Sequence, residues 1–311
     1  MADISRSELS TIIEEEYSHE LLDSAMANSV ALQAFRRVDM GTKTKNLPVL
    51  ATLPEAGFVT ESADETGVKP TAQATWGNKQ LVAEEIAVII PIHENVVDDA
   101  TVDALDEITK AGGAAIGRKL DGAVLFGVDK PVTWTSDDLS AAATAAGQTV
   151  EVAAHGEDDL IGSILQAAGL VDEAGWEPSD VLAPRGLRYR LANLRAGASD
   201  GTPVFLPSLS NTPGSVDTLA GLTGRWVTGR VWDRDEAEAL VVDAERVIIG
   251  VRQDISVKFL SEATVGGLNL AERDMVALRF KARYAYVLGD GTNAESNSTN
   301  CPVGMVTPVG S

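Results

Sequence analysis

Residues 76–92, WGNKQLVAEEIAVIIPI, carry the pattern on which the fold depends. From residue 86 onward an apolar residue occupies every second position, which is the two-residue period of a β-strand. The face so formed consists of Ile86, Val88, Ile90 and Ile92, with Ala87 and Ile89 on the other side. Residues 47–58 have a similar strand-like composition, and the polar stretch 61–70 separates the two segments. We therefore predict a long β-hairpin over residues 47–94 with a charged tip.

A hairpin of this length needs a partner outside itself. Two-stranded ribbons are marginally stable in water, because neither face has a core to cover it. The preceding residues pose the same problem. Residues 8–27 have the spacing of an amphipathic helix, and residues 29–40 follow it as an extended run that contains Phe35, Arg36 and Arg37. These segments predict an arm over residues 1–46 that lies on a neighbouring surface.

The period changes after the hairpin. Residues 96–127 carry apolar or small residues at steps of three and four, which predicts a helix of roughly 30 residues and about 45 Å. That stripe consists of Leu105, Ile108, Gly112, Ile116, Leu120 and Ala123. Gly112 and Gly113 lower helix propensity, so we expect either a bend or a close backbone approach there. Gly127 and Pro131 end the helix.

The remaining chain mixes helices and strands, which indicates an α+β protein. A Thr/Ala/Gly-rich connector over 133–147 precedes a helix over 158–174, a strand over 180–183 and a helix that begins at Pro184. Four further strands are predicted, over 239–242, 246–251, 255–260 and 275–288, and the polar tail 289–311 has no helical period.

Charge and composition exclude several functions. The 311 residues include 46 acidic and 25 basic side chains, a formal charge of −21, and such a surface repels phosphate. We therefore expect no sequence-specific binding of nucleic acid, although the acidity also suits a protein that must stay soluble. Cys301 is the single cysteine, so no internal disulfide forms. The start of the chain lacks a signal peptide pattern and the apolar run 86–92 is too short to span a bilayer, so no membrane association is predicted.

No catalytic, cofactor-binding or metal-binding residues emerge. His93-Glu94 resembles the opening of a zinc-protease motif, but no second histidine follows at the required spacing. Gly122 and Gly127 have the spacing of a phosphate-binding loop, but Val128-Asp129 stands where lysine and serine or threonine are needed. Adjacent carboxylates are expected by chance among 46 acidic residues.

The order of these parts resembles the major capsid proteins of tailed double-stranded-DNA bacteriophages, which share the Hong Kong 97 phage fold. The resemblance extends over essentially the whole chain. It is carried by Leu47-Pro48, Phe58-Val59-Thr60-Glu61, Pro91-Ile92-His93-Glu94, Val181-Leu182-Ala183-Pro184, Asp200-Gly201, Val241-Val242-Asp243, Ile248-Ile249-Gly250-Val251-Arg252 and Asp274-Met275-Val276-Ala277-Leu278-Arg279. His93 departs from the family, where serine is commoner at that position.

The resemblance implies a domain order and a function. It implies an N-terminal arm (1–46), an extended hairpin loop (47–94), a peripheral domain with a spine helix (95–130), an axial domain (131–244), peripheral strands (245–284) and a C-terminal segment that returns to the axial domain (285–311). The chain would assemble as pentamers and hexamers into an icosahedral head around the phage genome, with the hairpin over an adjacent subunit. Contact candidates are Phe35, Arg36, Arg37, Phe58, Glu61, Lys69 and Trp76.

The resemblance also implies partners. Because the arm begins almost at Met1, we expect a separate scaffold protein, together with a portal protein, a possible decoration protein and assembly in the host bacterial cytoplasm. Some members join a loop-tip lysine to an asparagine of another subunit, for which Lys69, Lys79 and Asn269 are the candidates. Two alternatives remain open: an encapsulin, which is a bacterial compartment shell with the same fold, and a soluble acidic α+β enzyme.

Overall fold

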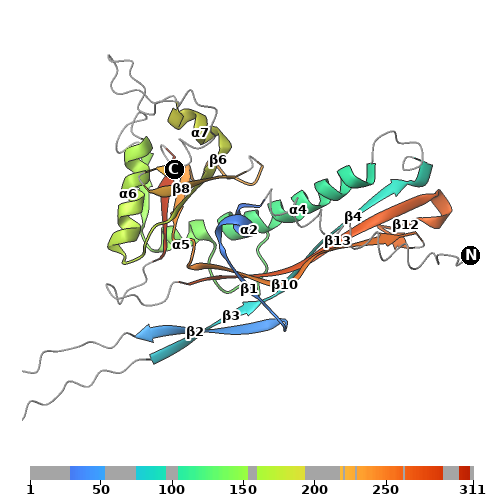
Figure 1. Ribbon diagram of the computed structural model, residues 1–311, viewed down its shortest axis with the longest axis horizontal. Helices are drawn as coiled ribbons and strands as arrows, with labels where there is room; N and C mark the ends of the chain where they lie inside the picture. Colours follow the sequence, from blue (N-terminus) through green and yellow to red (C-terminus); the bar gives the residue numbers. More distant parts are fainter. Residues whose placement is uncertain are drawn as a thin grey trace, which may run out of the picture.

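The computed structural model describes residues 29–52, 75–95, 104–152, 160–192, 218–219, 221–227, 230–261, 263–289 and 301–308. The predicted helix over 8–27 and the contact candidates Phe58, Glu61 and Lys69 lie outside these ranges. A four-stranded and a six-stranded sheet form the framework of the described chain, and one long helix connects them (Figure 1).

The first sheet has four strands in the order β1-β10-β13-β4. They are β1 (Arg36–Asp39), β10 (Val247–Leu260), β13 (Met275–Leu288) and β4 (Glu84–His93). β13 runs antiparallel to both neighbours, and β1 adds to β10 in parallel. The prediction of separate strands over 246–251 and 255–260 was wrong, because two register shifts between Val251 and Ser256 absorb the polar residues without ending the strand.

The predicted hairpin is divided at Ala83. β2 (Thr44–Thr52) pairs with β3 (Thr75–Val82), whereas β4 leaves the ribbon and pairs with β13. The prediction that the whole returning arm belongs to the hairpin, to residue 94, was therefore wrong for residues 84–93. The apolar face of β4 was assigned correctly, but it packs into the core of its own chain, which gives this half of the arm a different partner.

The long helix α4 (Ala104–Phe126) packs across the four-stranded sheet. Ile116, Leu120 and Ala123 on the predicted stripe are buried. Gly112 permits a close approach: a Cβ atom there would lie 2.8 Å from the ring of Phe280 in β13. The close approach expected from the glycines is thus confirmed at Gly112. The helix ends as predicted, at Gly127, whose φ of 64° favours glycine.

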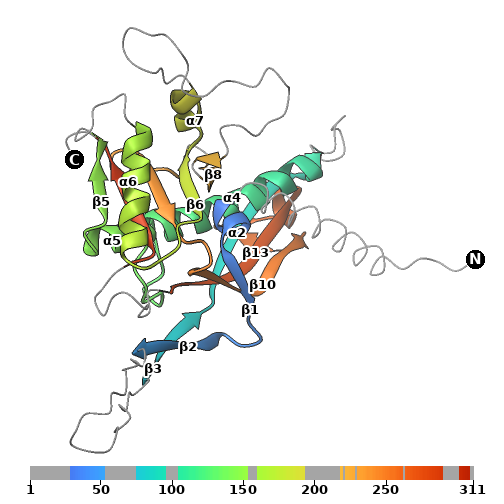
Figure 2. The same ribbon diagram turned by 60° about the vertical axis from the view of Figure 1, so that its left-hand side comes forward.

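The second sheet has six strands in the order β5-β14-β9-β6-β8-β7. They are β5 (Thr149–Glu151), β14 (Val303–Thr307), β9 (Ala239–Val242), β6 (Asp180–Pro184), β8 (Leu222–Val227) and β7 (Thr218–Leu219). Helices α6 (Leu160–Glu173) and α7 (Arg185–Ala192) cover one face (Figure 2). The other face joins the end of α4 and α5 (Leu139–Ala145) in the main core, so the central strands β9 and β6 are buried on both sides.

Several elements of this sheet were not predicted. The connector over 133–147 contains α5, which Asp138 caps by accepting a hydrogen bond from the backbone N–H of Ala141 (3.2 Å). The polar tail contains β14, which returns to pair with β9 and β5. Both elements are short, and packing against the sheet rather than local propensity stabilises them.

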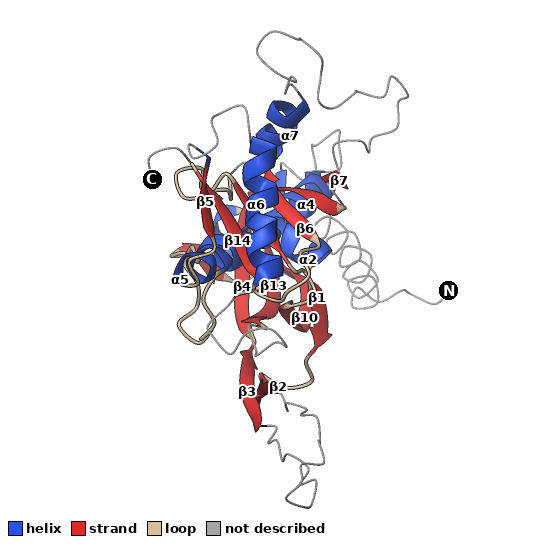
Figure 3. Ribbon diagram, turned by 90° about the vertical axis from the view of Figure 1, so that its left-hand side faces the viewer, coloured by secondary structure: helices blue, strands red, loops and turns tan. Residues whose placement is uncertain are grey.

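Four further small elements complete the described chain, of which Figure 3 labels α2. The short helix α2 (Val30–Ala34) precedes β1, and β11 (Thr264–Val265) pairs with β12 (Leu268–Asn269). A single 3-10 turn, η2 (Ala271–Arg273), leads into β13. Among the described residues, no helix is both long and apolar enough to cross a membrane.

Gly112 provides a test of the contact between α4 and β13. Alanine normally stabilises a helix interior relative to glycine by about 1 kcal/mol, but at Gly112 the methyl group meets the Phe280 ring. We expect Gly112→Ala to destabilise the chain by about 1–3 kcal/mol in denaturant unfolding. Gly169→Ala in α6 is the control, because nothing lies within 4 Å of its Cβ position; that variant should be slightly stabilised. Equal effects at both positions would contradict the close contact.

Candidate assembly surfaces

A buried carboxylate anchors the start of the described chain to the long helix. Asp121 of α4, 1% exposed, accepts hydrogen bonds from the Ser29 hydroxyl (2.7 Å) and from the backbone N–H groups of Val30 (3.0 Å) and Ala31 (3.0 Å). The acceptor satisfies free N–H groups at the N-terminus of α2, and the Ser29 hydroxyl also accepts from Leu32 N–H. The path of the chain into β1 is therefore fixed by a residue about ninety positions away in sequence.

Sequence analysis missed Asp121. Ser29 is a favoured N-cap residue and precedes an apolar run, so the sequence does indicate a helix start there. Nothing local identifies its partner, because Asp121 is one of 46 acidic residues and lies beside the apolar stripe of its helix. Burial raises the pKa of Asp121 to about 6, and its three hydrogen bonds only partly offset that cost.

The base of the β2–β3 ribbon is attached to the face of the four-stranded sheet opposite α4. Leu81 and Ala83 pack there against Met40, Ala285 and Val287. The Lys79 ammonium donates a hydrogen bond to the carbonyl of Leu288 (2.8 Å), and the Trp134 indole N–H donates to that of Val82 (3.0 Å). The ribbon is thus held at one end, and among the described residues β2 pairs only with β3.

Two buried side chains next to this base have altered ionisation. Burial lowers the pKa of Lys79, although Cys301 and Asp137 nearby oppose the shift. Burial also raises the pKa of the Cys301 thiol to about 12, so this cysteine is a packed thiol rather than a reactive thiolate. Cys301 packs in the main core where the tail enters the six-stranded sheet, whereas the half-buried Lys79 is bonded at the ribbon base.

The structure separates the predicted contact candidates. Phe35 is 4% exposed and packs in the main core of its own chain, whereas Arg36 and Arg37 are exposed on the edge strand β1. Trp76 lies in β3. For the cross-link candidates, Lys79 is bonded to its own chain at the ribbon base, and Asn269 lies opposite Thr264 in β12, a separate part of the molecule.

Two hollows occur on the described surface. One, of about 400 Å³, lies between β4 and α4, with Ile86, Val88, Ile116 and Trp134 in its lining. At its rim Lys119 forms an ion pair with Asp129. The other, of about 800 Å³, is polar and contains Arg36 and Asp243, with Arg246 stacked 4.9 Å from the ring centre of Trp176.

Neither hollow has an arrangement of groups suited to acid–base or nucleophilic chemistry. In the described ranges no three His, Cys, Asp or Glu side chains converge in a way that would bind a metal ion. The notable features of the molecule are instead an anchored N-terminal entry and a ribbon that leaves the body of the chain. Both are candidates for contact with another protein.

Comparison with known proteins identifies the family. Residues 10–292 match the phage capsid family. The chain belongs to this family. A solved structure from Mycobacterium phage Bobi is 54% identical, with a TM-score of 0.80 and 100% coverage of both chains. One from Microbacterium phage Oxtober96 is 39% identical, with a TM-score of 0.80 and coverage of 99% of this chain and 100% of that one. No match was found among curated proteins.

More distant structures share the fold. The capsid of a native GTA particle is 14% identical and has a TM-score of 0.59, with coverage of 91% of this chain and 89% of that chain. This phage capsid family member therefore has the α+β Hong Kong 97 type fold that its sequence predicted. It is a major capsid protein that forms the head shell, a structural protein and not an enzyme. The enzyme and encapsulin alternatives are set aside by the same matches.

The raised pKa of Asp121 predicts a pH dependence. The pKa of Asp121 is about 6 in the folded chain, against an ordinary 3.8. The protonated carboxyl therefore contributes its full share to the free energy of unfolding below pH 3.8, and this contribution is lost as the pH rises through 6. Relative to Asp121→Asn, which does not titrate, the original chain should lose about 3 kcal/mol of unfolding free energy between acidic and neutral pH. Denaturant unfolding of the unassembled chains, followed by tryptophan fluorescence, measures this difference. If the difference in unfolding free energy between the original chain and Asp121→Asn stays constant from acidic to neutral pH, the raised pKa of Asp121 is contradicted.

Proposed function

We propose that this capsid protein assembles as pentamers and hexamers that tile an icosahedral head around the phage genome. The observation that carries the proposal is the β2–β3 ribbon, which is attached at its base to the four-stranded sheet and pairs only with itself among the described residues. A ribbon without a sheet to join is stabilised by a neighbouring copy. Contacts of this kind repeat around a symmetry axis, and so close a shell.

The two sheets support the assignment of two domains to each copy. We propose that the six-stranded sheet with α5, α6 and α7 forms the axial domain, broadly residues 131–244 with the returning β14. The four-stranded sheet with α4 would form the peripheral domain, residues 95–130 and 245–284. The separate apolar clusters on the two faces of the six-stranded sheet support this, because α6 and α7 have a core distinct from that beneath α4.

Further partners follow from the same proposal. A shell that packages DNA needs an entry vertex and a guide to its curvature, so we propose a portal protein, a separate scaffold protein and, on the outer surface, a possible decoration protein. Assembly takes place in the host bacterial cytoplasm. The formal charge of −21 accords with a shell that encloses DNA without sequence-specific contacts.

Electron microscopy tests the proposal directly. We expect the purified chain, alone or co-expressed with the scaffold candidate encoded by a neighbouring gene, to form uniform round or angular shells in negative stain. A homogeneous small oligomer that persists under both conditions would contradict the proposed assembly.

Denaturing gels of the same particles test the cross-link candidates. A covalent bond from Lys69 or Lys79 to Asn269 of another copy would produce a ladder of oligomers that resists boiling in detergent. A single band, with the intact mass of one chain, would exclude the cross-link. Lys69→Arg and Lys79→Arg, each of which keeps the charge, would show which lysine is responsible for any ladder.

A further inference from the structure

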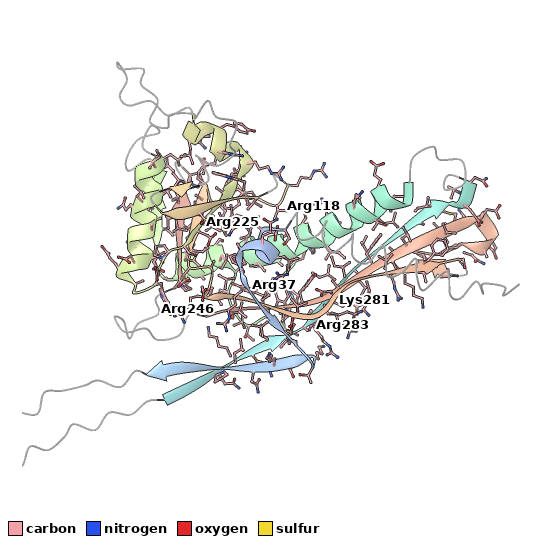
Figure 4. All side chains as sticks on the ribbon, in the orientation of Figure 1. Arg37, Arg118, Arg225, Arg246, Lys281 and Arg283 are labelled. Carbon is pink, nitrogen blue, oxygen red and sulfur yellow. The ribbon has the colours of Figure 1, made fainter. Side chains whose placement is uncertain are left out.

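Four cationic side chains gather on the face of the four-stranded sheet that points away from α4. We name them the basic strip: Lys258 of β10 with Arg279, Lys281 and Arg283 of β13. The intervening residues Phe280 and Ala282 are buried beneath α4, so the alternation along β13 turns the three cations to the opposite face. Figure 4 labels Lys281 and Arg283 on this strand.

The strip is only partly balanced within its own chain. Glu85 of β4 forms ion pairs with Lys281 (2.7 Å) and Arg283 (3.1 Å). Lys258 and Arg279 are directly opposite each other in the strand register, and like charges in this position destabilise a sheet. The Nε atom of Arg279 is also buried, and it has no hydrogen-bond partner among the described residues. Among the residues that the structure describes, no carboxylate forms an ion pair at this end of the strip.

The chain itself contains a matching anion. Residues 61–65, Glu-Ser-Ala-Asp-Glu, carry three carboxylates in five positions and belong to the segment between β2 and β3. With Glu85 counted, the four cations of the strip leave a net charge of +3, which equals in size the charge of the three carboxylates in residues 61–65. Electrostatic complementarity of this kind fixes register between partners and excludes incorrect ones.

The position of the ribbon indicates that this anion comes from another copy. The ribbon base packs on the same face of the sheet as the strip, through Leu81 and Ala83. From there β2 and β3 run away from the end of the sheet that carries β12 (Figure 1). Copies in a shell are related by rotation about an axis normal to its surface, so the same face of the sheet points to the same side of the shell in every copy. A neighbour's ribbon therefore lies on the side of the shell to which the basic strip points.

The N-terminal segment is a second acidic candidate, because it contains Glu14, Glu15 and Glu16. The described chain begins at Ser29, which is bonded to Asp121 of α4 on the opposite side of the sheet. The ribbon segment is therefore favoured.

We propose that the basic strip of one copy binds the acidic segment 61–65 of a second copy. Glu61, Asp64 and Glu65 would supply the carboxylates that Lys258 and Arg279 lack, and would share Lys281 and Arg283 with Glu85. The inference rests on the proposed function, since only an assembled shell brings the two segments together. It adds to that function the location and the chemistry of one contact between subunits.

Zero-length chemical cross-linking tests the contact without any substitution. A carbodiimide joins a carboxylate to an amine when the two are in contact. Particles assembled from a mixture of ¹⁴N-labelled and ¹⁵N-labelled chains should yield linked peptides from Lys258 or Lys281 to residues 61–65, with one peptide of each label. Linkage of these lysines to Glu14–Glu16 instead, or no linkage to 61–65, would overturn the proposal.

Charge exchange tests it by assembly. We expect Lys258→Glu/Lys281→Glu to lower the particle yield at least about tenfold, because like charges across an interface cost several kcal/mol. Glu61→Lys/Glu65→Lys alone should have a similar effect, and the combination of all four substitutions should restore assembly. The control is Arg185→Glu/Arg230→Glu, which changes net charge equally at exposed positions outside the strip; the loop substitutions should not improve its yield.

A folding control accompanies this experiment. Lys258→Glu alone converts the like-charged pair with Arg279 into an opposite pair, so it should raise the unfolding temperature of the unassembled chain while it lowers particle yield. If the original chain forms no particles, the proposed function fails and this inference fails with it. If the original chain forms particles but the fourfold combination assembles no better than the strip variant, only the present inference fails.

Discussion

Strand β13 is the constraint on which the rest of this capsid protein depends. It is hydrogen-bonded along most of its length to β10 on one side and to β4 on the other. One of its faces lies beneath α4, where the Phe280 ring occupies the space left by Gly112. The other face carries both the base of the ribbon and the basic strip. A change in the register of β13 by one residue would therefore exchange the core and the assembly surface.

Specific attachments to this framework orient two segments, the start of the described chain and the β2–β3 ribbon. Asp121 binds the N-terminus of α2 through three hydrogen bonds, and Leu81 with Lys79 fixes the ribbon to the far face of the sheet. Each attachment determines where a segment leaves the body of the chain. In a shell protein that direction matters more than any pocket, because the same contact is repeated by every copy.

The distribution of charge has a comparable consequence. A chain with a formal charge of −21 repels its own copies, so an attractive surface requires cations concentrated in one place. The basic strip provides such a place on a rigid strand, and it tolerates an unfavourable pair between Lys258 and Arg279 within the isolated chain. If the proposed contact forms, the same side chains affect both the stability of the single copy and its affinity for a neighbour.

The sequence by itself determined the apolar face of residues 86–92 and the stripe of α4, because these follow from the period of neighbouring residues, and the order of its parts carried the resemblance to the fold family. For the glycine pair at 112–113 it left a bend and a close approach as alternatives, and the structure shows the close approach at Gly112. The alternation of Arg279, Lys281 and Arg283 is also present in the sequence, but only the sheet shows which face these cations occupy. Only the tertiary structure decided that the returning arm divides at Ala83, that Asp121 anchors Ser29, and that the polar tail supplies β14. These features depend on residues distant in sequence, and local periodicity contains no information about which of two competing partners a segment will find.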